Sequence, residues 1–294
     1  MLRKDMEINM KLPFQIDIAG KIALVTGGGG VLGSEFAKAL AACGAKVAVC
    51  DLRLEAAQKI ADEITSDGGT AIAVAANVLD KASLEAAREE IIAKFGTVDI
   101  LLNGAGGNNP KGTTTKEYLF PEDLEGTAED VKTFFDLDPD GIGFVFNLNF
   151  LGTLLPTQVF AKDMAKKGDT VILNVSSMNA FSPLTKIPAY SGAKAAVSNF
   201  TQWLAVHFSK VGIRVNAIAP GFFCTNQNHA LLFNEDGSLT ARSEKILNHT
   251  PMNRFGETDD LIGTLLWLVD NKASGFVNGV VVPVDGGFAA YSGV

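Results

Sequence analysis

Near its amino terminus the chain reads Thr26-Gly27-Gly28-Gly29-Gly30-Val31-Leu32-Gly33, directly after a short apolar run and directly before a segment with helical periodicity. Gly28, Gly30 and Gly33 match the spacing G-x-G-x-x-G. This spacing indicates a dinucleotide-binding turn where a strand precedes it and a helix follows, which is the order here. Glycines let the backbone approach a pyrophosphate, and free N–H groups of the following helix attract the anion. If the glycine motif stood alone in the sequence, a flexible turn that binds no ligand would be the alternative interpretation. In this context the stretch predicts a dinucleotide-binding turn.

Seven short apolar runs are typical of buried parallel strands. They are Ile22–Val25, Lys46–Cys50, Ala71–Ala75, Val98–Leu102, Val171–Val175, Val215–Ala219 and Val280–Val284. Between the early runs, three segments have the apolar spacing of helices, and each is followed by glycine at the position of a left-handed C-cap. These segments are Glu35–Cys43, Leu54–Ile64 and Leu84–Phe95, and the glycines are Gly44, Gly68–Gly69 and Gly96. The alternation predicts an α/β, doubly wound Rossmann fold, a single parallel sheet with helices on both faces.

Composition favours one soluble globular domain over residues 1–294, with 47% hydrophobic and 20% charged residues. The formal net charge of −8 argues against nucleic acid as a partner, because phosphate contacts require a clustered Lys/Arg surface. Cys43, Cys50 and Cys224 have no metal-ligand spacing, so we expect no metal site and reduced thiols in a cytoplasmic protein. Residues 1–15 lack the apolar run of a signal peptide, and we expect no membrane span, which needs roughly 18 apolar residues.

Two polar stretches interrupt the alternation of strands and helices. Gly107–Asp140 is rich in Thr, Asn, Pro and acidic residues, and Phe222–Gly256 is also polar. Long polar loops in a compact α/β domain usually cover or form binding sites. We therefore expect 107–140 to be an inserted loop and 222–256 a substrate loop, both beside the active site.

Asp51 follows the second apolar run and lies 18 residues beyond Gly33. This is near the spacing at which a carboxylate accepts hydrogen bonds from the adenosine ribose hydroxyls of a bound dinucleotide. Because a carboxylate there repels a 2′-phosphate, the sequence favours NAD over NADP. Arg53 lies two residues further on and weakens that preference, and a solvated aspartate at a strand end is the alternative interpretation.

Tyr190-Ser191-Gly192-Ala193-Lys194 opens an amphipathic stretch, which places Tyr190 and Lys194 one helical turn apart on the same face. A phenol titrates near pH 10, so it is a base at neutral pH only where a nearby cation favours the phenolate. The preceding strand ends in Ser176-Ser177, which brings a hydroxyl to the sheet edge where α/β proteins bind ligands. Ser177 lies 13 residues before Tyr190. A single Tyr-x-x-x-Lys pair is also common on ordinary helix surfaces.

The combination of these motifs resembles the short-chain dehydrogenase/reductase family, over roughly Gly20 to Phe288. Further matches occur in the family's order: Asn103-Gly104-Ala105-Gly106, Asn149, Arg214-Val215-Asn216 leading to Pro220-Gly221, and Asp285-Gly286-Gly287. The resemblance implies hydride transfer between nicotinamide and a substrate carbon, with NAD as cofactor. It implies that Tyr190 moves the hydroxyl proton, Ser177 holds the substrate oxygen, Lys194 orients the ribose and lowers the tyrosine pKa, and Asn149 anchors a water of the proton relay.

The resemblance also implies a set of cofactor-binding residues. They are Gly27, Gly28, Gly30, Val31, Leu32, Gly33, Asp51, Asn77, Val78, Asn103, Ala105, Gly106, Tyr190, Lys194, Pro220, Gly221, Phe223 and Thr225. Three positions depart from the family pattern: Val31 replaces a glycine of the phosphate turn, Asn77 replaces an aspartate near the adenine, and Gly104 replaces an asparagine. We expect Gly30 to allow the close phosphate approach in place of Val31.

The substrate prediction rests on the two polar stretches. The interval from Gly106 to Asn149 is 43 residues, longer than is usual for the family, and the chain resembles its D-mannonate oxidoreductase (fructuronate reductase) branch. Asn108, Asn109 and Lys111 in the first stretch, and Arg242 and Arg254 in the second, are the candidate substrate residues. Unpaired buried polar groups are costly, so these side chains suit a sugar acid or polyol better than an apolar substrate.

Several alternatives remain open at this point. Lys111 and Arg242 are equal candidates for binding a substrate carboxylate, and each polar side chain of the two stretches is equally well explained as a solvated loop residue. A 3-oxoacyl reductase, a neutral polyol dehydrogenase and a non-catalytic NAD-sensing protein are the competing functions. The resemblance implies a homodimer or homotetramer formed through the helices that carry Asn149 and Tyr190.

Overall fold

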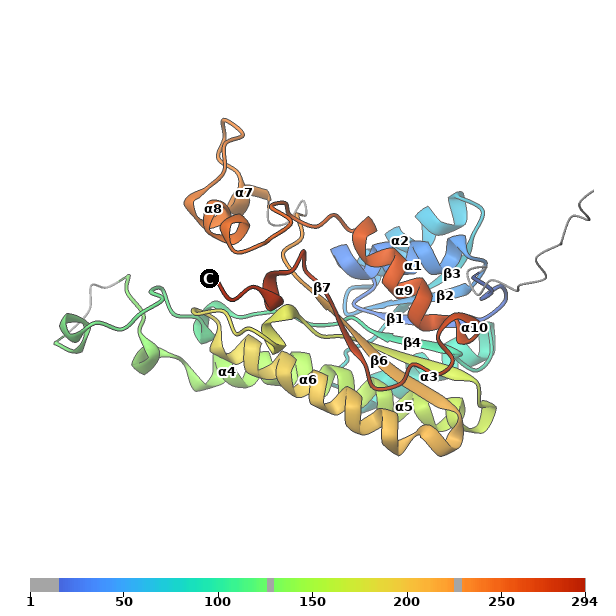
Figure 1. The fold of residues 1–294 in the computed structure, drawn as a ribbon. Helices are drawn as coiled ribbons and strands as arrows, with labels where there is room; N and C mark the ends of the chain where they lie inside the picture. Colours follow the sequence, from blue (N-terminus) through green and yellow to red (C-terminus); the bar gives the residue numbers. More distant parts are fainter. Residues whose placement is uncertain (1–15, 126–129, 225–228, 294) are drawn as a thin grey trace, which may run out of the picture.

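A computed structural model describes residues 16–125, 130–224 and 229–293 of the chain. Its sheet has seven parallel strands in the order β3-β2-β1-β4-β5-β6-β7 (Figure 1). The strands are β1 Ile22–Thr26, β2 Lys46–Asp51, β3 Thr70–Ala75, β4 Ile100–Asn103, β5 Thr170–Val175, β6 Ile213–Pro220 and β7 Val281–Val284. The strand order reverses between β1 and β4, which makes the crevice beyond their carboxyl ends the expected ligand site of an open α/β sheet. The predicted fold class and all seven predicted strands are confirmed.

Helices cover both faces of this sheet (Figure 1). On one face lie α1 Val31–Ala42, α2 Leu54–Ser66 and α9 Asp259–Val269, and on the other lie α3 Lys81–Lys94, α5 Gly152–Lys167 and α6 Pro188–His207. Successive β1 residues belong to different cores, because Ala23 and Val25 pack with the first group while Ile22 and Leu24 pack with the second. The strands are therefore apolar on both faces, which explains why they read as continuous apolar runs in the sequence.

The remaining helices are short. They are α4 Pro139–Phe146, α7 His229–Leu232, α8 Ala241–Asn248 and α10 Asn271–Ser274. Between α4 and α5, residues Asn147–Leu151 form a turn of π-helix, so the helical path is continuous from Pro139 to Lys167. This stretch contains a window that is long and apolar enough to cross a membrane by length and composition. Half of its apolar window is buried within the protein, where α5 packs against α3, β4 and β5.

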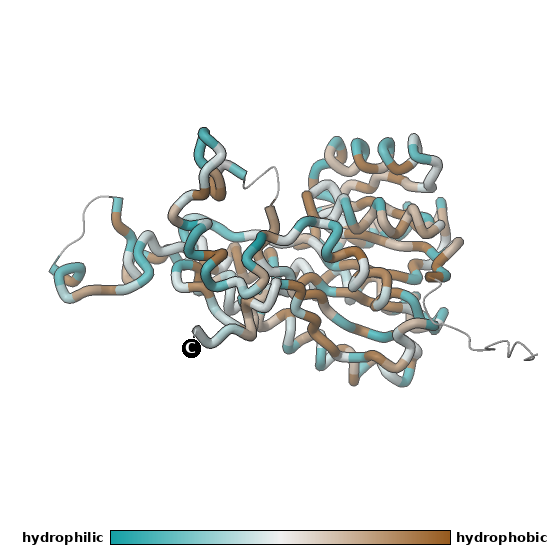
Figure 2. Tube along the Cα trace, turned by 45° about the horizontal axis from the view of Figure 1, so that its top comes forward, coloured by the Kyte–Doolittle hydropathy of each residue, from teal (hydrophilic) through white to brown (hydrophobic). Residues whose placement is uncertain are grey.

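The two polar stretches project from the carboxyl edge of the sheet (Figure 1). Where the structure describes it, the first stretch contains three 3-10 turns, at Pro110–Gly112, Pro121–Leu124 and Phe134–Asp136, and it ends where α4 begins. The second stretch, predicted as a loop, contains α7 and α8. Helix α8 forms because the Thr240 Oγ1 accepts from the Ser243 amide at 3.2 Å and because Ile246 is buried. Figure 2 shows that hydrophobic residues concentrate in the strands, with more polar residues in both projecting stretches.

Candidate active site

The glycine turn after β1 leaves no space for side chains at Gly27, Gly28 and Gly33. Gly27 has a positive φ of 65°, and a Cβ on Gly27 would lie 2.9 Å from the Ala105 Cα. On Gly28 it would lie 2.7 Å from the Val49 side chain, and on Gly33 it would lie 2.2 Å from the Gly27 carbonyl oxygen. A Cβ on Gly30 would meet only the Gly27 oxygen, at 3.2 Å. The turn therefore exposes bare backbone at the start of α1, a surface that fits a pyrophosphate.

Asp51 ends β2 beside this turn, as its spacing in the sequence predicts. Its Oδ2 accepts from the Gly29 amide at 3.1 Å and its Oδ1 accepts from the Arg53 amide at 3.1 Å. A Cβ on Gly29 would meet the Ala56 side chain at 2.6 Å, so this position also requires glycine. Sequence analysis did not include Gly29 in the site, although its place within a run of four glycines was the available signal.

A second backbone segment, Asn103-Gly104-Ala105-Gly106, leaves β4 next to the glycine turn. The Thr26 Oγ1 accepts from the amides of Gly104 at 3.1 Å and Ala105 at 3.4 Å, which ties this segment to the end of β1. A Cβ on Gly104 would lie 2.8 Å from the Thr26 carbonyl oxygen. In this backbone arrangement the position therefore accepts only glycine, whereas the family pattern has asparagine there.

Asn103 is buried beneath this segment. Its Nδ2 donates to the Asn174 Oδ1 at 2.9 Å and to the Thr157 Oγ1 at 3.1 Å, and the Asn174 Nδ2 donates to the Thr201 Oγ1 at 2.9 Å. These hydrogen bonds join β4, β5, α5 and α6 below the carboxyl edge. Among the described residues, the Asn103 Oδ1 has no hydrogen-bonding partner.

Asn77 and Val78 follow β3 on the other side of the crevice. Asn77 is exposed and its Oδ1 accepts from the Leu79 amide at 3.0 Å, whereas Val78 is buried. A Cβ on Gly152 would lie 3.2 Å from the Val78 side chain, so the start of α5 packs closely on this loop.

Ser177, Tyr190 and Lys194 come together between β5 and α6. Ser177 is the N-cap of the turn Met178–Ala180, where its Oγ accepts from the Asn179 amide at 3.3 Å. Burial raises the pKa of the Tyr190 phenol above its ordinary value, and a hydrogen bond with the Ser177 side chain opposes this effect. The Lys194 Nζ lies 5.6 Å from the centre of the Tyr190 ring and donates to the Val175 carbonyl oxygen at 2.7 Å. Burial lowers the pKa of Lys194 to about 8.

Asn149 lies in the π-helical turn and is fully buried. Its Nδ2 donates to the carbonyl oxygens of Gly107 at 2.7 Å and Val145 at 2.8 Å. A Cβ on Gly106 would lie 2.7 Å from the Asn149 Oδ1 and 3.2 Å from the Lys194 Nζ. Asn149 and Lys194 therefore converge on the backbone at Gly106, next to the tyrosine.

The β6 end of the site is also closely packed. The Gly221 amide donates to the Val284 carbonyl oxygen at 3.0 Å, and a Cβ on Gly221 would lie 2.6 Å from the Asp285 Cα. Pro220 ends β6 and Phe223 is buried in a bridge with Gly256. Thr225, the remaining residue predicted at this end, lies outside the described residues.

Four of the five candidate substrate residues form hydrogen bonds or ion pairs with other residues of the chain. The Asn108 Nδ2 donates to the Thr113 Oγ1 at 3.1 Å, and the Asn109 Oδ1 accepts from the Lys111 amide at 2.9 Å. The Lys111 ammonium pairs with Asp138 at 3.4 Å. Arg254 forms a two-point ion pair with Asp260, at 2.7 and 2.8 Å. The guanidinium of Arg242 has neither a hydrogen bond nor an ion pair to any described residue.

Arg242 instead lines a groove of about 590 Å³ at the carboxyl edge. Its walls come from the inserted stretch at Glu117 and Tyr118, from residues 182–187 between Ser177 and Tyr190, and from α8, with Phe222 and Phe288 completing it. This volume is in the range of small-molecule sites. Residues 182–187 connect the groove along the chain to Tyr190, which does not itself line it.

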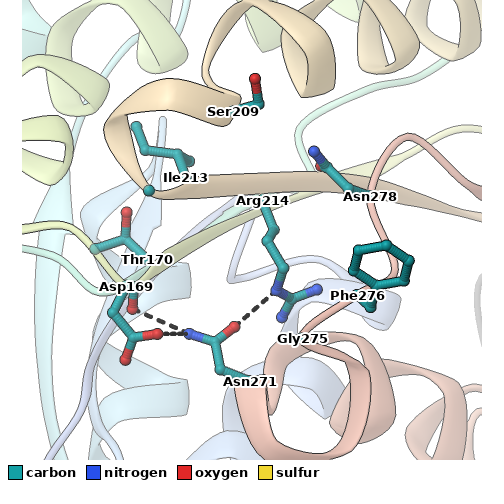
Figure 3. Close-up of a pocket in the computed structure, with 10 residues that line it drawn as sticks. Asp169, Thr170, Ser209, Ile213, Arg214, Asn271, Gly275, Phe276 and Asn278 are labelled. Atoms are coloured by element: carbon teal, nitrogen blue, oxygen red, sulfur yellow. Dashed lines mark hydrogen bonds between the residues drawn. The ribbon is translucent and has the colours of Figure 1, made fainter.

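Figure 3 shows a second cavity, of about 610 Å³, at the opposite edge of the sheet. It is lined by the first residues of β5 and β6 and by the segment before β7. Here the Arg214 Nε donates to the Asn271 Oδ1 at 2.7 Å, and its other nitrogens donate to the carbonyl oxygens of Leu268 and Val277. Arg214 therefore stabilises the fold at the amino edge of the sheet. Only Pro220 and Gly221, at the other end of the same segment, reach the candidate active site.

Comparison with known proteins agrees with this geometry. Residues 21–235 match the family model described as short chain dehydrogenase. The chain belongs to the short-chain dehydrogenase family. It is an oxidoreductase of the kind that acts on hydroxyl and carbonyl groups.

Among curated short-chain dehydrogenase relatives, an uncharacterized oxidoreductase of Haemophilus influenzae is 60% identical over 98% of this chain and 100% of its own length. A 2-dehydro-3-deoxy-D-gluconate 5-dehydrogenase of Dickeya dadantii is 33% identical over 93% of this chain and 97% of its own length.

Two solved structures are also informative. A Haemophilus influenzae protein with bound NAD, provisionally named a D-mannonate oxidoreductase, is 60% identical with a TM-score of 0.90, covering 95% of this chain and 98% of that one. A gluconate 5-dehydrogenase of Burkholderia cenocepacia, in complex with NADP and tartrate, is 29% identical with a TM-score of 0.78, again covering 95% and 98%.

Proposed function

We propose that this short-chain dehydrogenase is an NAD-dependent sugar-acid oxidoreductase that interconverts D-mannonate and D-fructuronate. The observation that carries the substrate class is the charge of the groove. Three cationic side chains, Lys186, Arg242 and Lys245, and one carboxylate, Glu117, line it in a chain whose net charge is −8. A local excess of positive charge in an acidic protein favours an anionic small molecule.

In this proposal Ser177, Tyr190, Lys194 and Asn149 each have a distinct role in the chemistry. When bound, the nicotinamide supplies the hydride chemistry, and the protein supplies position and electrostatics. Tyr190 takes the hydroxyl proton in oxidation and returns it in reduction. The Ser177 hydroxyl, which already bonds with Tyr190, holds the substrate oxygen. The Lys194 ammonium stabilises the phenolate, and Asn149 holds the backbone at Gly107 beside it.

The preference for NAD is supported by Asp51. Its carboxylate is held beside the glycine turn by the Gly29 and Arg53 amides, where it would repel a 2′-phosphate. The Haemophilus influenzae structure holds NAD, whereas the less similar Burkholderia structure holds NADP.

Two of the compared proteins support a sugar acid as substrate. The D-mannonate name of the Haemophilus influenzae structure and the 2-dehydro-3-deoxy-D-gluconate name of the Dickeya dadantii relative both denote carboxylated sugars. A neutral polyol leaves the excess cations of the groove without a partner, and an acyl chain leaves its polar groups unpaired.

The test compares D-mannonate with the neutral hexitols D-mannitol and D-sorbitol under NAD, in the oxidative direction. We expect D-mannonate to give the highest kcat/KM. Equal or higher values for the hexitols would make a polyol dehydrogenase the correct function. NAD binding without turnover of any of these compounds, or of a 3-oxoacyl thioester in reduction, would favour a sensor.

We also propose that the chain is a single domain and that it acts in the cytoplasm as a homodimer or homotetramer. The exposed face of α6 supports the assembly, since Trp203 and Val206 are 55% and 77% exposed. Analytical ultracentrifugation tests it, and a monomer at micromolar concentration would contradict it.

A further inference from the structure

The cations of the groove differ in whether their charge is already paired. The Lys245 ammonium forms an ion pair with the Glu117 carboxylate. Within the described residues, the ammonium of Lys186 and the guanidinium of Arg242 have no hydrogen-bonding or ion-pair partner. Two of the three cations are therefore free to bind an external anion.

The two free cations are carried on well-anchored backbone. Lys186 lies four residues before Tyr190, and its carbonyl oxygen accepts from the Thr114 amide at 2.9 Å. Arg242 lies in the first turn of α8, which is capped by Thr240 and fixed by the Ser243 Oγ, a donor to the Leu232 carbonyl oxygen at 2.6 Å. The two side chains thus line the groove from two separate segments, residues 182–187 and α8.

The Glu117–Lys245 ion pair connects α8 to the inserted stretch, which in turn contacts the Lys186 segment through the Thr114 amide. It joins the inserted stretch to α8 across 128 residues of sequence. The pKa of the Glu117 carboxyl is held below its ordinary value, first by the hydrogen bond and charge of Lys245, and then by the charges of Lys186 and His249. Lys186 therefore lies within electrostatic range of the pair. The His249 Nδ1 is occupied by the Lys245 carbonyl oxygen at 2.8 Å.

We propose that Lys186 and Arg242 together bind the carboxylate of the substrate, and that the Glu117–Lys245 ion pair positions α8, which carries Arg242, against the inserted stretch that contacts the Lys186 segment. The proposal rests on the proposed function, because it assumes a carboxylated substrate. A guanidinium offers a planar fork that matches a carboxylate, and an ammonium adds a point charge. Leu184, Ile187 and Ile246 supply the apolar lining between these polar groups.

Lys186 is chosen over Lys111 because Lys111 already has an ion-pair partner and lies outside the groove. Lys111 is paired with Asp138, its side chain is 65% exposed, and it does not line the groove. Lys186 lines the groove in the segment that leads directly to Tyr190. The carboxylate site is thereby linked to the catalytic tyrosine by one continuous segment of chain.

The experiment uses the full-length enzyme with NAD and compares Lys186→Met, Arg242→Met and the matched control Lys111→Met. We expect each groove variant to raise KM for D-mannonate by about ten- to a hundredfold, with kcat within about threefold, because hydrogen bonds to charged groups are strong. Turnover of D-mannitol, where measurable, and NADH affinity stay within about twofold. Lys111→Met behaves as the wild type.

Three outcomes would overturn this inference: an unchanged KM in both groove variants, an equal loss with D-mannitol, or a selective loss in Lys111→Met. Failure of the proposed function is recognised separately. If the wild type oxidises no sugar acid, the function itself is wrong. If the wild type oxidises D-mannonate and the groove variants keep its KM, only the carboxylate site is wrong. Thermal unfolding of each variant checks that it is folded.

Discussion

Asn149 holds the backbone of Gly107 at two points: its Nδ2 donates to the carbonyl oxygen at 2.7 Å and its Oδ1 accepts from the amide at 3.3 Å. The contact connects the π-helical turn to the first residue of the inserted stretch. Gly106, one residue earlier, lies against both the Asn149 Oδ1 and the Lys194 Nζ. The position of the inserted stretch and the polar groups around Tyr190 are therefore set by the same few atoms.

We expect Gly106→Ala to lower kcat/KM by about tenfold or more, because the added methyl would displace the Asn149 amide and the Lys194 ammonium. The matched control is Gly107→Ala, whose Cβ would meet only the Leu148 side chain at 3.6 Å, an ordinary contact. Steady-state kinetics with NAD and D-mannonate measure both variants. Equal activities of the two variants would show that the crowding at Gly106 has no catalytic consequence.

Replacing Tyr190 by Phe removes the hydroxyl and keeps the ring. We expect turnover to fall by about 10² to 10⁴-fold, the usual contribution of a general acid/base, while NADH affinity stays within a few-fold. Stopped-flow or steady-state rates and NADH fluorescence titration give the two quantities. Near-normal turnover would remove Tyr190 from its assigned role.

Lys194→Met should move the pH profile of oxidation to higher pH. Burial raises the pKa of Tyr190, so the phenolate forms at higher pH when the adjacent ammonium is absent. The variant should therefore lose about 10²-fold in rate near pH 7 and recover part of that loss as the pH rises. Rates from about pH 6 to about pH 10 measure this shift. Parallel profiles for variant and wild type would contradict the electrostatic role of Lys194.

The burial of Lys194 also predicts how stability depends on pH. Its pKa is lowered to about 8 in the folded protein, so between that value and its ordinary pKa the unfolded chain binds more protons. The contribution of Lys194 to stability is therefore least favourable below about pH 8 and becomes more favourable as the pH rises through this range. In Lys194→Met the same rise should be absent. Urea unfolding of both proteins across this range measures the difference, and identical pH dependence would refute it.

Asp51→Ser should weaken the discrimination against NADP. The wild-type carboxylate is fixed beside the glycine turn, where it would repel a 2′-phosphate. We expect the ratio of kcat/KM for NAD to that for NADP to fall by about tenfold or more in the variant. A wild-type enzyme that prefers NADP would show instead that Arg53, and not Asp51, determines the cofactor preference.

The local sequence pattern was sufficient to predict the strands, the ends of the early helices and the shared face of Tyr190 and Lys194. The seven strands and the C-cap glycines Gly44, Gly68 and Gly96, all with positive φ, lie where the apolar runs and glycines predicted them. Tyr190 and Lys194 share a helix face because their separation is one helical turn. The helix α7 was missed because it is only four residues long, and α8 was missed because its sequence is polar and short and its stability comes from capping by Thr240 and from the buried Ile246.

What the amino-acid sequence determined by itself is the backbone of the site: the bare glycine turn, the strand that ends at Asp51, and the Ser177, Tyr190 and Lys194 set. Each is marked by a short local motif, and Ser177 and Tyr190 are only 13 residues apart in the chain. Which cations stay free was decided by the tertiary structure. Arg254 is neutralised by Asp260 and Lys245 by Glu117, whereas Lys186 and Arg242 line the groove without a partner among the residues that the structure describes. The physical reason is that an ion pair depends on distance in space, and Glu117 meets Lys245 only after the fold has brought residues 128 positions apart into contact.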